Sequence, residues 1–331
     1  MSRLQPDFAD LAPDDAQLLS EARRRFTDLR LAVVGDAILD CYRFTDGRST
    51  CFAGGAAVIA GHLRGLGARP TLITLVGRDG DSKRLLEIIR ELRIDCEALP
   101  QRAALPTRTR HVIGRTIRAQ RRLELFSPPP PETTGQVVGA VAELRTGLDA
   151  AIFTDFGYGT VCPATLQSLQ PILRPQVPFL AGDVSGPRAS LLAMRRFDWL
   201  TPTEKELRQL TANVQAQPPL NQIAARLRAD LGLRHLLVTR DREGCVRFDA
   251  DGSIHPAASP AAEVRDEVGA GDALLAVSTL ARTAGFDPDQ AVRLGQWAAA
   301  AAVAQLGNAP LTWDRLALAA SRASTTARPA A

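Results

Sequence analysis

The feature that most constrains the fold is the regular alternation of short apolar runs with helical segments along the chain. The apolar runs are bounded by turn residues, are typical of strands buried on both faces, and lie near 31–34, 71–76, 151–154, 179–182 and 235–239. Helical patterns lie at 16–26, 55–66, 82–92, 136–144, 273–283 and 288–305. Strands that alternate with helices predict an α/β fold with a mostly parallel sheet covered by helices on both sides.

The chain of 331 residues has a similar composition along its length, with 45% hydrophobic and 23% charged residues, which fits one large globular domain. We expect this domain to span 28–320, after an N-terminal extension over 1–27. The last segment, 321–331, is rich in Ala, Ser and Thr and is expected to be a disordered tail. A run of prolines at 128–131 cannot join a helix interior or a sheet ladder and predicts a surface connector.

Composition excludes several functional classes. The formal net charge is +4 and the basic residues are spread out, so no nucleic-acid partner is expected. No stretch is long and apolar enough to cross a membrane, and the acidic N-terminus lacks the apolar core of a secretion signal, which predicts a cytoplasmic protein. The five cysteines are odd in number and scattered, which argues against a disulfide framework or a zinc site and favours reduced thiols.

The strongest chemical signal is the segment Asp266-Glu-Val-Gly-Ala-Gly-Asp272, which runs directly into a helical pattern. Its glycines allow consecutive backbone N–H groups to turn toward one point, and the first turn of the helix adds unpaired donors and a positive dipole end. Such a turn can hold a phosphate. Asp272 is either the N-cap of the helix or a base that accepts a proton from an attacking hydroxyl, and both interpretations stay open.

A second set of polar residues follows the first expected strand. Asp36 and Asp40 stand just beyond 31–34, at the edge of an open parallel sheet where ligands commonly bind, and could accept hydrogen bonds from sugar hydroxyls. Gly54 and Gly55 precede a helix and would let the backbone approach a ligand closely. The alternative is that one of the two aspartates caps a helix and the other is a solvated acid in a loop.

A third candidate is Thr203 with Glu206 at the start of another helix. An acid on the first helical turn could hold a water molecule of a magnesium ion. The same spacing fits a capping box, in which Thr203 caps the helix and Glu206 returns a hydrogen bond.

Other nucleotide and hydrolase signatures do not occur in the sequence. Lys83 and Lys205 are the only lysines and neither lies in a glycine loop, so a Walker-type phosphate loop is excluded. The dinucleotide fingerprint Gly-x-Gly-x-x-Gly and the nucleophile elbow Gly-x-Ser-x-Gly are also missing.

Residues 107–118 alternate with period two around Gly114 and predict a hairpin with arginines on one face. We hypothesise that the arginines at 108, 110, 115 and 118 bind an anionic group of a substrate. Solvated arginines on an edge strand, which discourage aggregation, are the alternative.

Together these motifs resemble the ribokinase-like carbohydrate kinases, also called the PfkB family, over residues 30–310. The resemblance rests on several segments in the family's order, namely Val34-Gly-Asp36, Asp40-Cys-Tyr42, Gly54-Gly-Ala-Ala57, Thr154-Asp-Phe-Gly157, Leu200-Thr-Pro202, Leu237-Val-Thr-Arg240 and Gly269-Ala-Gly-Asp272. Within the family, the chain is most similar to the branch that phosphorylates D-glycero-D-manno-heptose 7-phosphate for ADP-heptose synthesis. The resemblance implies a three-layer α/β/α sandwich with a small, reduced β lid at about 41–53 and 107–125.

The resemblance also implies an activity, the phosphorylation of a hydroxyl on a sugar or sugar phosphate with ATP and Mg²⁺. Asp272 would be the catalytic base, and the anion hole would consist of Gly269, Ala270 and Gly271. The substrate would be held by Asp36, Asp40, Gly54, Gly55 and Arg118. The nucleotide would be bordered by Thr203, Glu206, Thr239, Gly244 and Asn308, with Glu206 reaching the metal through water.

The chain departs from the family pattern at several positions. Val58 and Thr203 replace asparagines, and Tyr158 and Ser185 replace lysines. The segment 42–54 is shorter than in the heptose kinases, which predicts the reduced lid, and without His-x-Gly-His a nucleotidyltransferase half is not expected. Two alternatives stay open, a nucleoside kinase of the same fold and a sugar- or nucleotide-binding protein with weak catalysis. A homodimer contact and a monovalent-cation requirement are also left open.

Overall fold

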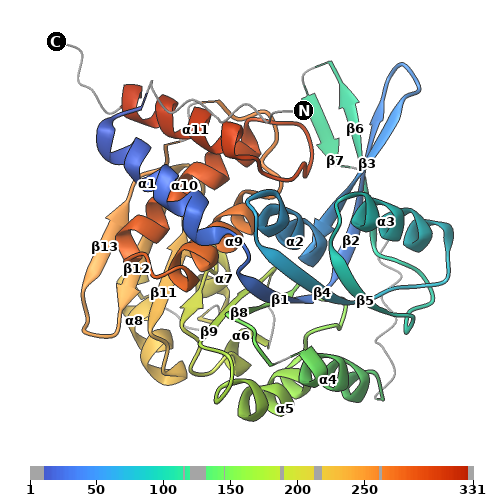
Figure 1. The fold of residues 1–331 in the computed structure, drawn as a ribbon, viewed down its shortest axis with the longest axis horizontal. Helices are drawn as coiled ribbons and strands as arrows, with labels where there is room; N and C mark the ends of the chain where they lie inside the picture. Colours follow the sequence, from blue (N-terminus) through green and yellow to red (C-terminus); the bar gives the residue numbers. More distant parts are fainter. Residues whose placement is uncertain are drawn as a thin grey trace.

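The computed structural model describes residues 11–114, 116–119, 132–144, 146–186, 190–211, 218–260 and 263–326. A nine-stranded sheet in the order β13-β12-β11-β10-β9-β8-β1-β4-β5 forms its centre (Figure 1). The strands are β1 (Arg30–Gly35), β4 (Arg69–Leu75), β5 (Asp95–Leu99), β8 (Ala150–Asp155), β9 (Phe179–Val184), β10 (Trp199–Leu200), β11 (His235–Thr239), β12 (Cys245–Asp249) and β13 (Ile254–Ala257). A second sheet, in the order β3-β2-β6-β7, contains β2 (Ala37–Phe44), β3 (Ser49–Gly55), β6 (Thr107–Ile113) and β7 (Thr116–Ala119).

Helices cover both faces of the large sheet (Figure 1). One layer contains α1 (Pro13–Phe26), α2 (Ala56–Gly65), α3 (Gly80–Glu91), α9 (Ala270–Thr283), α10 (Pro288–Val303) and α11 (Trp313–Thr326). The other contains α4 (Glu132–Leu144), α5 (Pro163–Leu173), α6 (Ser190–Ala193), α7 (Glu204–Gln209) and α8 (Leu220–Leu231). A short 3₁₀ helix, η1 (Asp241–Glu243), follows β11. Among the described residues, no helix combines the length and hydrophobicity needed to span a membrane.

The hydrophobic pattern of β1 explains the three layers. Leu31 and Val33 point into the cluster under α1, α2 and α9, whereas Ala32 and Val34 point into the cluster under α4 and α5. A strand that is apolar on both faces must be covered on both sides, and the expected α/β/α sandwich is confirmed. The strands from β11 through β10, β9, β8, β1 and β4 to β5 run parallel to one another.

Both ends of the chain differ from the sequence expectation. Leu19 and Phe26 of α1 are fully buried in the core, so the segment expected as an extension packs as part of the α/β sandwich. At the other end, α11 continues to Thr326, into the segment expected to be a disordered tail, because its apolar residues pack against α10. The proline run at 128–131 lies outside the described residues.

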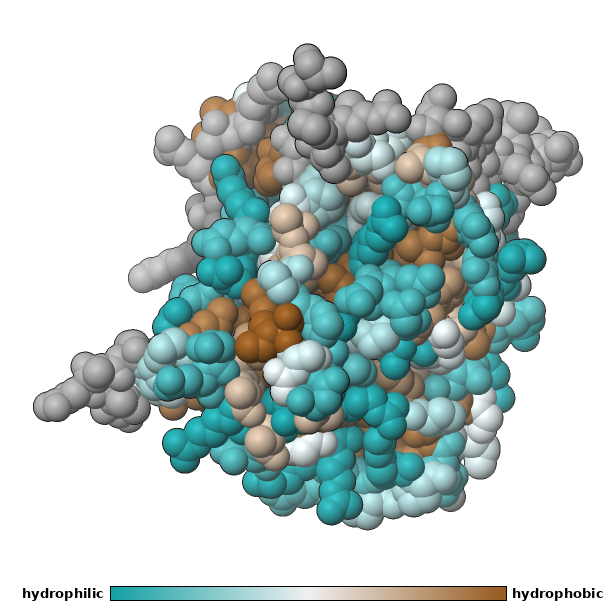
Figure 2. Space-filling model, turned by 90° about the vertical axis from the view of Figure 1, so that its left-hand side faces the viewer, coloured by the Kyte–Doolittle hydropathy of each residue, from teal (hydrophilic) through white to brown (hydrophobic). Residues whose placement is uncertain are grey.

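The β13 edge of the large sheet is protected from further strand pairing. Both β12 and β13 are antiparallel to their neighbours, and Pro256 within β13 removes a backbone donor. Figure 2 shows the side of the molecule that carries this edge, where hydrophobic residues form separate islands among hydrophilic ones.

The small sheet brings one carboxylate, a tyrosine and two arginines to one face. In the parallel pair β2 and β6, Asp40 pairs with Arg108 and Tyr42 with Arg110, so all four share a face. The expected hairpin is present, with Gly114 at a φ of 60° in the turn between β6 and β7.

The expectation that Arg118 shares the face of the other arginines is corrected by the register. Ile113 pairs with Thr116, and position 118 therefore pairs with His111, on the face away from Arg110. The side chain of Arg118 and all of residue 115 lie outside the described residues.

The cysteine expectation is also corrected, because Cys41 and Cys51 form a disulfide bond. These residues are directly opposite each other in the antiparallel pair of β2 and β3, with Cα atoms 4.1 Å apart. Their pairing depends on strand register, which scattered cysteines in a sequence do not reveal. The other three, Cys96, Cys162 and Cys245, are free thiols.

We expect the disulfide to stabilise the small sheet. Cys41→Ser should lower the free energy of unfolding by about 2–3 kcal/mol, because the bond restricts the unfolded chain. Denatured protein treated with an alkylating agent should label at Cys96, Cys162 and Cys245 before reduction and at all cysteines afterwards. Mass spectrometry of the labelled protein checks this, and full labelling without a reductant would contradict the bond.

Candidate active site

A cavity of about 260 Å³ lies where the small sheet meets the carboxyl ends of the central strands and the beginning of α9. Ligands of open parallel α/β sheets bind at this edge. Its lining contains several of the residues singled out from the sequence, namely Asp40, Gly55, Arg108, Arg110, Thr203, Glu206, Gly269, Ala270, Gly271, Asp272 and Asn308. Residues from segments far apart in the chain therefore converge on one space.

The glycine turn has the geometry expected of an anion site. Gly269 has a φ of 83°, which glycine adopts without strain, and a side chain there would strike Asn308. Helix α9 begins at Ala270, so its first N–H groups face the cavity without helical partners. Gly271 is exposed, and a Cβ atom there would meet nothing within 4 Å, which leaves room for a ligand against the backbone.

The structure answers the question of whether Asp272 caps α9. The N-cap residue is Gly269, and no side chain provides a cap hydrogen bond. Asp272 is only partly exposed, and burial raises its pKa to about 7, with Arg108 lowering the pKa and Asp40 raising it. A carboxylate with a pKa near 7 that lines a cavity has the properties of a general base.

Asp40 is the centre of a buried network on the floor of the cavity. Its Oδ1 accepts a hydrogen bond from Arg110 at 2.7 Å and its Oδ2 accepts one from Asn308 at 2.7 Å. A Cβ atom at position 54 would lie 2.2 Å from Asp40, so only glycine fits there. A carboxylate can accept about four hydrogen bonds, which leaves capacity for substrate hydroxyls.

Asp36 differs from the expectation that it would hold the sugar. It is fully buried, does not line the cavity, and has both oxygens occupied by the protein. Arg102 donates to Oδ1 at 2.6 Å, Thr160 N–H donates to Oδ1 at 2.9 Å, and Tyr158 N–H donates to Oδ2 at 2.9 Å. Asp36 therefore orders residues 156–160 beside the cavity, which a strand-end acid in a sequence does not reveal.

Asp266 links the glycine turn to two other parts of the site. Its carboxylate accepts hydrogen bonds from Tyr42 Oη at 2.6 Å, from Gly307 N–H at 3.0 Å and from Val268 N–H at 3.2 Å. Tyr42 belongs to β2, so this acid fixes the small sheet against the segment that leads into α9. In the sequence, Asp266 is recognisable only as the first residue of the segment that contains the glycine turn.

The side of the cavity near α7 contains two further acids. Thr203 and Glu206 form the capping box, and Glu206 Oε1 also accepts from Gly186 N–H at 2.7 Å. Asp183, which sequence analysis did not single out, has a buried Oδ1 without a hydrogen-bond partner. Burial raises the pKa of Asp183 well above its usual value, and the charges of Glu206 and Asp272 raise it further.

This acidic corner fits a magnesium ion, which proteins often bind through one or two carboxylates together with substrate phosphates. A divalent cation would offset the repulsion that raises the pKa of Asp183. Within the described ranges, no group of three or more His, Cys, Asp and Glu side chains is arranged to hold a metal without other ligands.

A second cavity of about 190 Å³ adjoins the first and shares Thr203, Glu267, Ala270 and Gly271 with it. Thr239 and Gly244 line it, as expected for residues bordering a nucleotide, whereas Asn308 lies in the first cavity beside Asp40. Its remaining lining, which sequence analysis missed, includes Ser259, Leu274, Gln296 and Ala299. Gln296 is a polar residue just before the alanine-rich half of α10, and this pattern in the sequence could have drawn attention to it.

Arg108 stands out among the arginines of the small sheet. Arg110 is paired with Asp40, but Arg108 lines the cavity without an ion pair or hydrogen bond in the described part of the chain. Among the departures from the family pattern, Val58 and Tyr158 are buried and Ser185 lines the cavity.

A mostly parallel α/β sandwich, a glycine turn at a helix start and two adjoining cavities fit a phosphotransferase that acts on a small molecule. Residues 28–314 match the pfkB family carbohydrate kinases, and the chain belongs to this family of sugar kinases. Kinases of the family use ATP, typically with a divalent metal.

Two relatives are similar over most of the chain. The D-beta-D-heptose 7-phosphate kinase of Bordetella bronchiseptica is 29% identical, with 88% of this chain and 96% of that protein aligned. The bifunctional protein HldE of Trichlorobacter lovleyi is 28% identical over 90% of this chain, and the chain spans 64% of the length of that relative.

Solved structures confirm the fold at lower identity. Phosphofructokinase-2 from Escherichia coli, in complex with potassium, is 18% identical with a TM-score of 0.74, covering 90% of this chain and 99% of that one. Ribokinase from Arabidopsis thaliana, complexed with ribose and ATP, is 18% identical with a TM-score of 0.65, covering 89% and 99%.

The pair of Asp36 and Arg102 provides a test of the buried network. Removing the cation by Arg102→Ala should lower the free energy of unfolding by about 3–5 kcal/mol, because it leaves a buried charge without its partner. Denaturant unfolding measures this. Arg84→Ala, which removes an exposed pair with Glu87, is the matched control and should cost less than about 1 kcal/mol. An equal loss in the free energy of unfolding for both variants would show that the buried carboxylate of Asp36 does not need Arg102 as its partner.

Proposed function

We propose that the chain transfers the γ-phosphoryl group of ATP to a hydroxyl of a sugar phosphate, with Asp272 as the general base. The observation that supports this most directly is the state of Asp272. It caps no helix, its pKa is raised to about 7, and it lines the same cavity as the glycine turn, Asp40 and Arg108. A carboxylate without a structural task in such a place is suited to proton transfer.

In the proposed reaction, Asp272 accepts the proton of the acceptor hydroxyl while the oxygen forms a bond to the phosphorus atom. ATP supplies the phosphoryl group, and the bond to the leaving ADP breaks. The N–H groups at Gly269, Ala270 and Gly271 face the negative charge that develops on the phosphoryl oxygens.

On the acceptor side, Asp40 would accept hydrogen bonds from sugar hydroxyls, and Gly55 would allow close backbone approach. Arg108 is the cation available for an anionic group, since Arg110 is paired with Asp40. This favours a phosphorylated acceptor over a neutral sugar or a nucleoside. The names of the two relatives make heptose 7-phosphate the first acceptor to test.

On the donor side, Thr203, Thr239 and Gly244 would border the nucleotide in the second cavity. Asp183 and Glu206 would hold magnesium beside the phosphates, Glu206 through water because both its oxygens already accept backbone hydrogen bonds. The metal would neutralise negative charge on the phosphates during transfer.

Asp272→Asn should lower kcat by about 10²–10⁴-fold, the usual contribution of a general base. In the parent, kcat should rise with pH through about 7, as Asp272 loses its proton, and this dependence should be absent in the variant. Steady-state assays of ADP release across pH 5–9 with heptose 7-phosphate check both. A variant that turns over as fast as the parent would rule out this base.

The same substitution should increase stability at high pH. A carboxyl whose pKa is raised on folding contributes stability below its unfolded pKa and loses it as pH rises through the folded value. Asp272→Asn should therefore unfold at a higher temperature than the parent above pH 7 and at a similar temperature near pH 4. A loss of activity together with a loss of stability would instead indicate a structural role.

Arg108→Ala should raise KM for a phosphorylated acceptor by about tenfold to a hundredfold, since hydrogen bonds to charged groups contribute about 1.5–3 kcal/mol. The pKa seen in the kcat profile should also increase, because Arg108 lowers the pKa of Asp272. Arg43→Ala, on the other face of the same sheet, is the control and should change neither. An unchanged KM would contradict the sugar-phosphate class, and binding without turnover of any sugar phosphate, sugar or nucleoside would favour a binding protein.

A further inference from the structure

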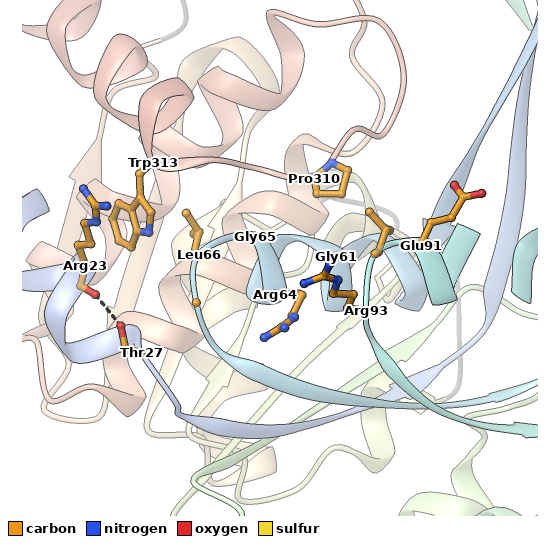
Figure 3. A pocket seen from close by; sticks show the side chains of 12 residues that line it. Arg23, Thr27, Gly61, Arg64, Gly65, Leu66, Glu91, Arg93, Pro310 and Trp313 are labelled. Carbon is orange, nitrogen blue, oxygen red and sulfur yellow. Dashed lines mark hydrogen bonds between the residues drawn. The ribbon is translucent and has the colours of Figure 1, made fainter. Parts of the chain in front are cut away.

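A separate cavity lies in the helical layer, at the C-terminal ends of α1, α2 and α3 and beside the segment that leads into α11 (Figure 3). It shares no lining residue with either active-site cavity. Its volume is about 520 Å³, within the range of small-molecule sites.

Three arginines line this cavity without an ion pair or side-chain hydrogen bond among the residues described, namely Arg23, Arg64 and Arg93. Arg69, a surface arginine near the cavity, differs from these three because it pairs with Asp28 at 2.7 Å. Glu91 is the acidic member of the lining, so three guanidinium groups face one carboxylate.

Helix ends do not remove this excess of positive charge. Two of the arginines, Arg23 and Arg64, stand in the last turns of α1 and α2, where the carbonyl ends of a helix attract cations by about 0.3–1 kcal/mol. Such an attraction orients a side chain but supplies no hydrogen-bond acceptor for the guanidinium. An anion between these side chains could receive several charge-assisted hydrogen bonds.

The same cavity has an apolar side. Trp313 is half-buried, with one part of its ring packed against Phe26 at a centroid distance of 5.7 Å, and it also borders the cavity. Figure 3 shows Trp313 with Arg23 at one end, Arg93 with Glu91 at the other, and Leu66 between them. An indole beside arginines suits a ligand with a planar ring and a negative group.

We propose that this cavity is a second ligand site that binds a small organic phosphate, with its phosphate at Arg64 and Arg93 and its planar ring against Trp313. A nucleoside monophosphate has this chemistry and fits the volume. Two elements connect the site to the first cavity. Gly55, just before α2, and Asn308, just before the segment to Trp313, both line the active-site cavity, so an occupant contacts elements that also border the active site.

The two elements also contact each other closely. A Cβ atom at Gly65 of α2 would lie 2.1 Å from the carbonyl oxygen of Leu311, and Leu311 N–H donates to His62 Nδ1 at 3.2 Å. Helix α2 and the segment that leads to Trp313 are therefore packed closely against each other beside this cavity. A ligand would meet a formed site and would not need to open one.

Binding of AMP and of inorganic phosphate to the full chain, measured by isothermal titration calorimetry, tests the proposal. The double variant Arg64→Gln/Arg93→Gln should weaken binding of AMP at one site by at least about tenfold, because it removes two charge-assisted partners. Arg24→Gln/Arg84→Gln removes the same charge elsewhere on α1 and α3 and should leave the affinity unchanged. AMP bound in the nucleotide cavity would survive in both variants as a separate event.

The ring contact has its own readout. AMP should bind at least about tenfold more tightly than inorganic phosphate, and Trp313→Leu should reduce that preference without changing the affinity for phosphate. Equal AMP affinity in the parent and the Arg64→Gln/Arg93→Gln variant would overturn the site, and equal affinities for AMP and phosphate would overturn the ligand class. Since binding is measured, the result does not depend on kinase activity.

Discussion

Burying a carboxylate costs several kcal/mol unless donors or cations replace its water, and this cost organises the site. Hydrogen bonds from Tyr42, Gly307 and Val268 replace the water around Asp266, and they connect β2 to the glycine turn. Hydrogen bonds from Arg110 and Asn308 do the same for Asp40, and they connect the small sheet to the segment after α10. The small sheet and the start of α9 are thus held together largely by satisfied acids.

Asp272 and Asp183 are the exceptions, and their difference from the satisfied acids supports a functional role for both. Asp272 provides no cap for α9 and has no hydrogen bond or ion pair among the described residues, and Asp183 keeps a buried oxygen without a donor. For both, burial is the largest cause that raises the pKa, and the hydrogen bonds that lower the pKa of Asp183 do not offset it. A site that satisfies Asp36, Asp40 and Asp266 with hydrogen bonds retains these two acids at a cost in stability, which is the usual relation between a reaction site and the structure that supports it.

Local signals in the sequence were enough for the layers and the glycine turn. Apolar runs located strands such as β1 and β8, and glycines 269 and 271 predicted the turn before α9 because their conformational freedom is visible in the residue type itself. What could not be predicted depends on register and long-range contact. The Cys41–Cys51 bond, the face on which position 118 falls and the place of Asn308 beside Asp40 all depend on which strands and turns become neighbours.

The departures from the family pattern also require long-range contacts to interpret. At position 158 a tyrosine stands where the pattern has a lysine, which on its own suggests a lost cation. Arg102, from a different segment, lies 5.9 Å from the Tyr158 ring centroid and forms the ion pair with Asp36. Asp36 in turn accepts hydrogen bonds from the backbone N–H groups of Phe156, Tyr158 and Thr160, so a cation from elsewhere in the chain is paired with the acid that orders this loop. A motif position judged alone therefore does not reveal which charged groups the fold brings beside it.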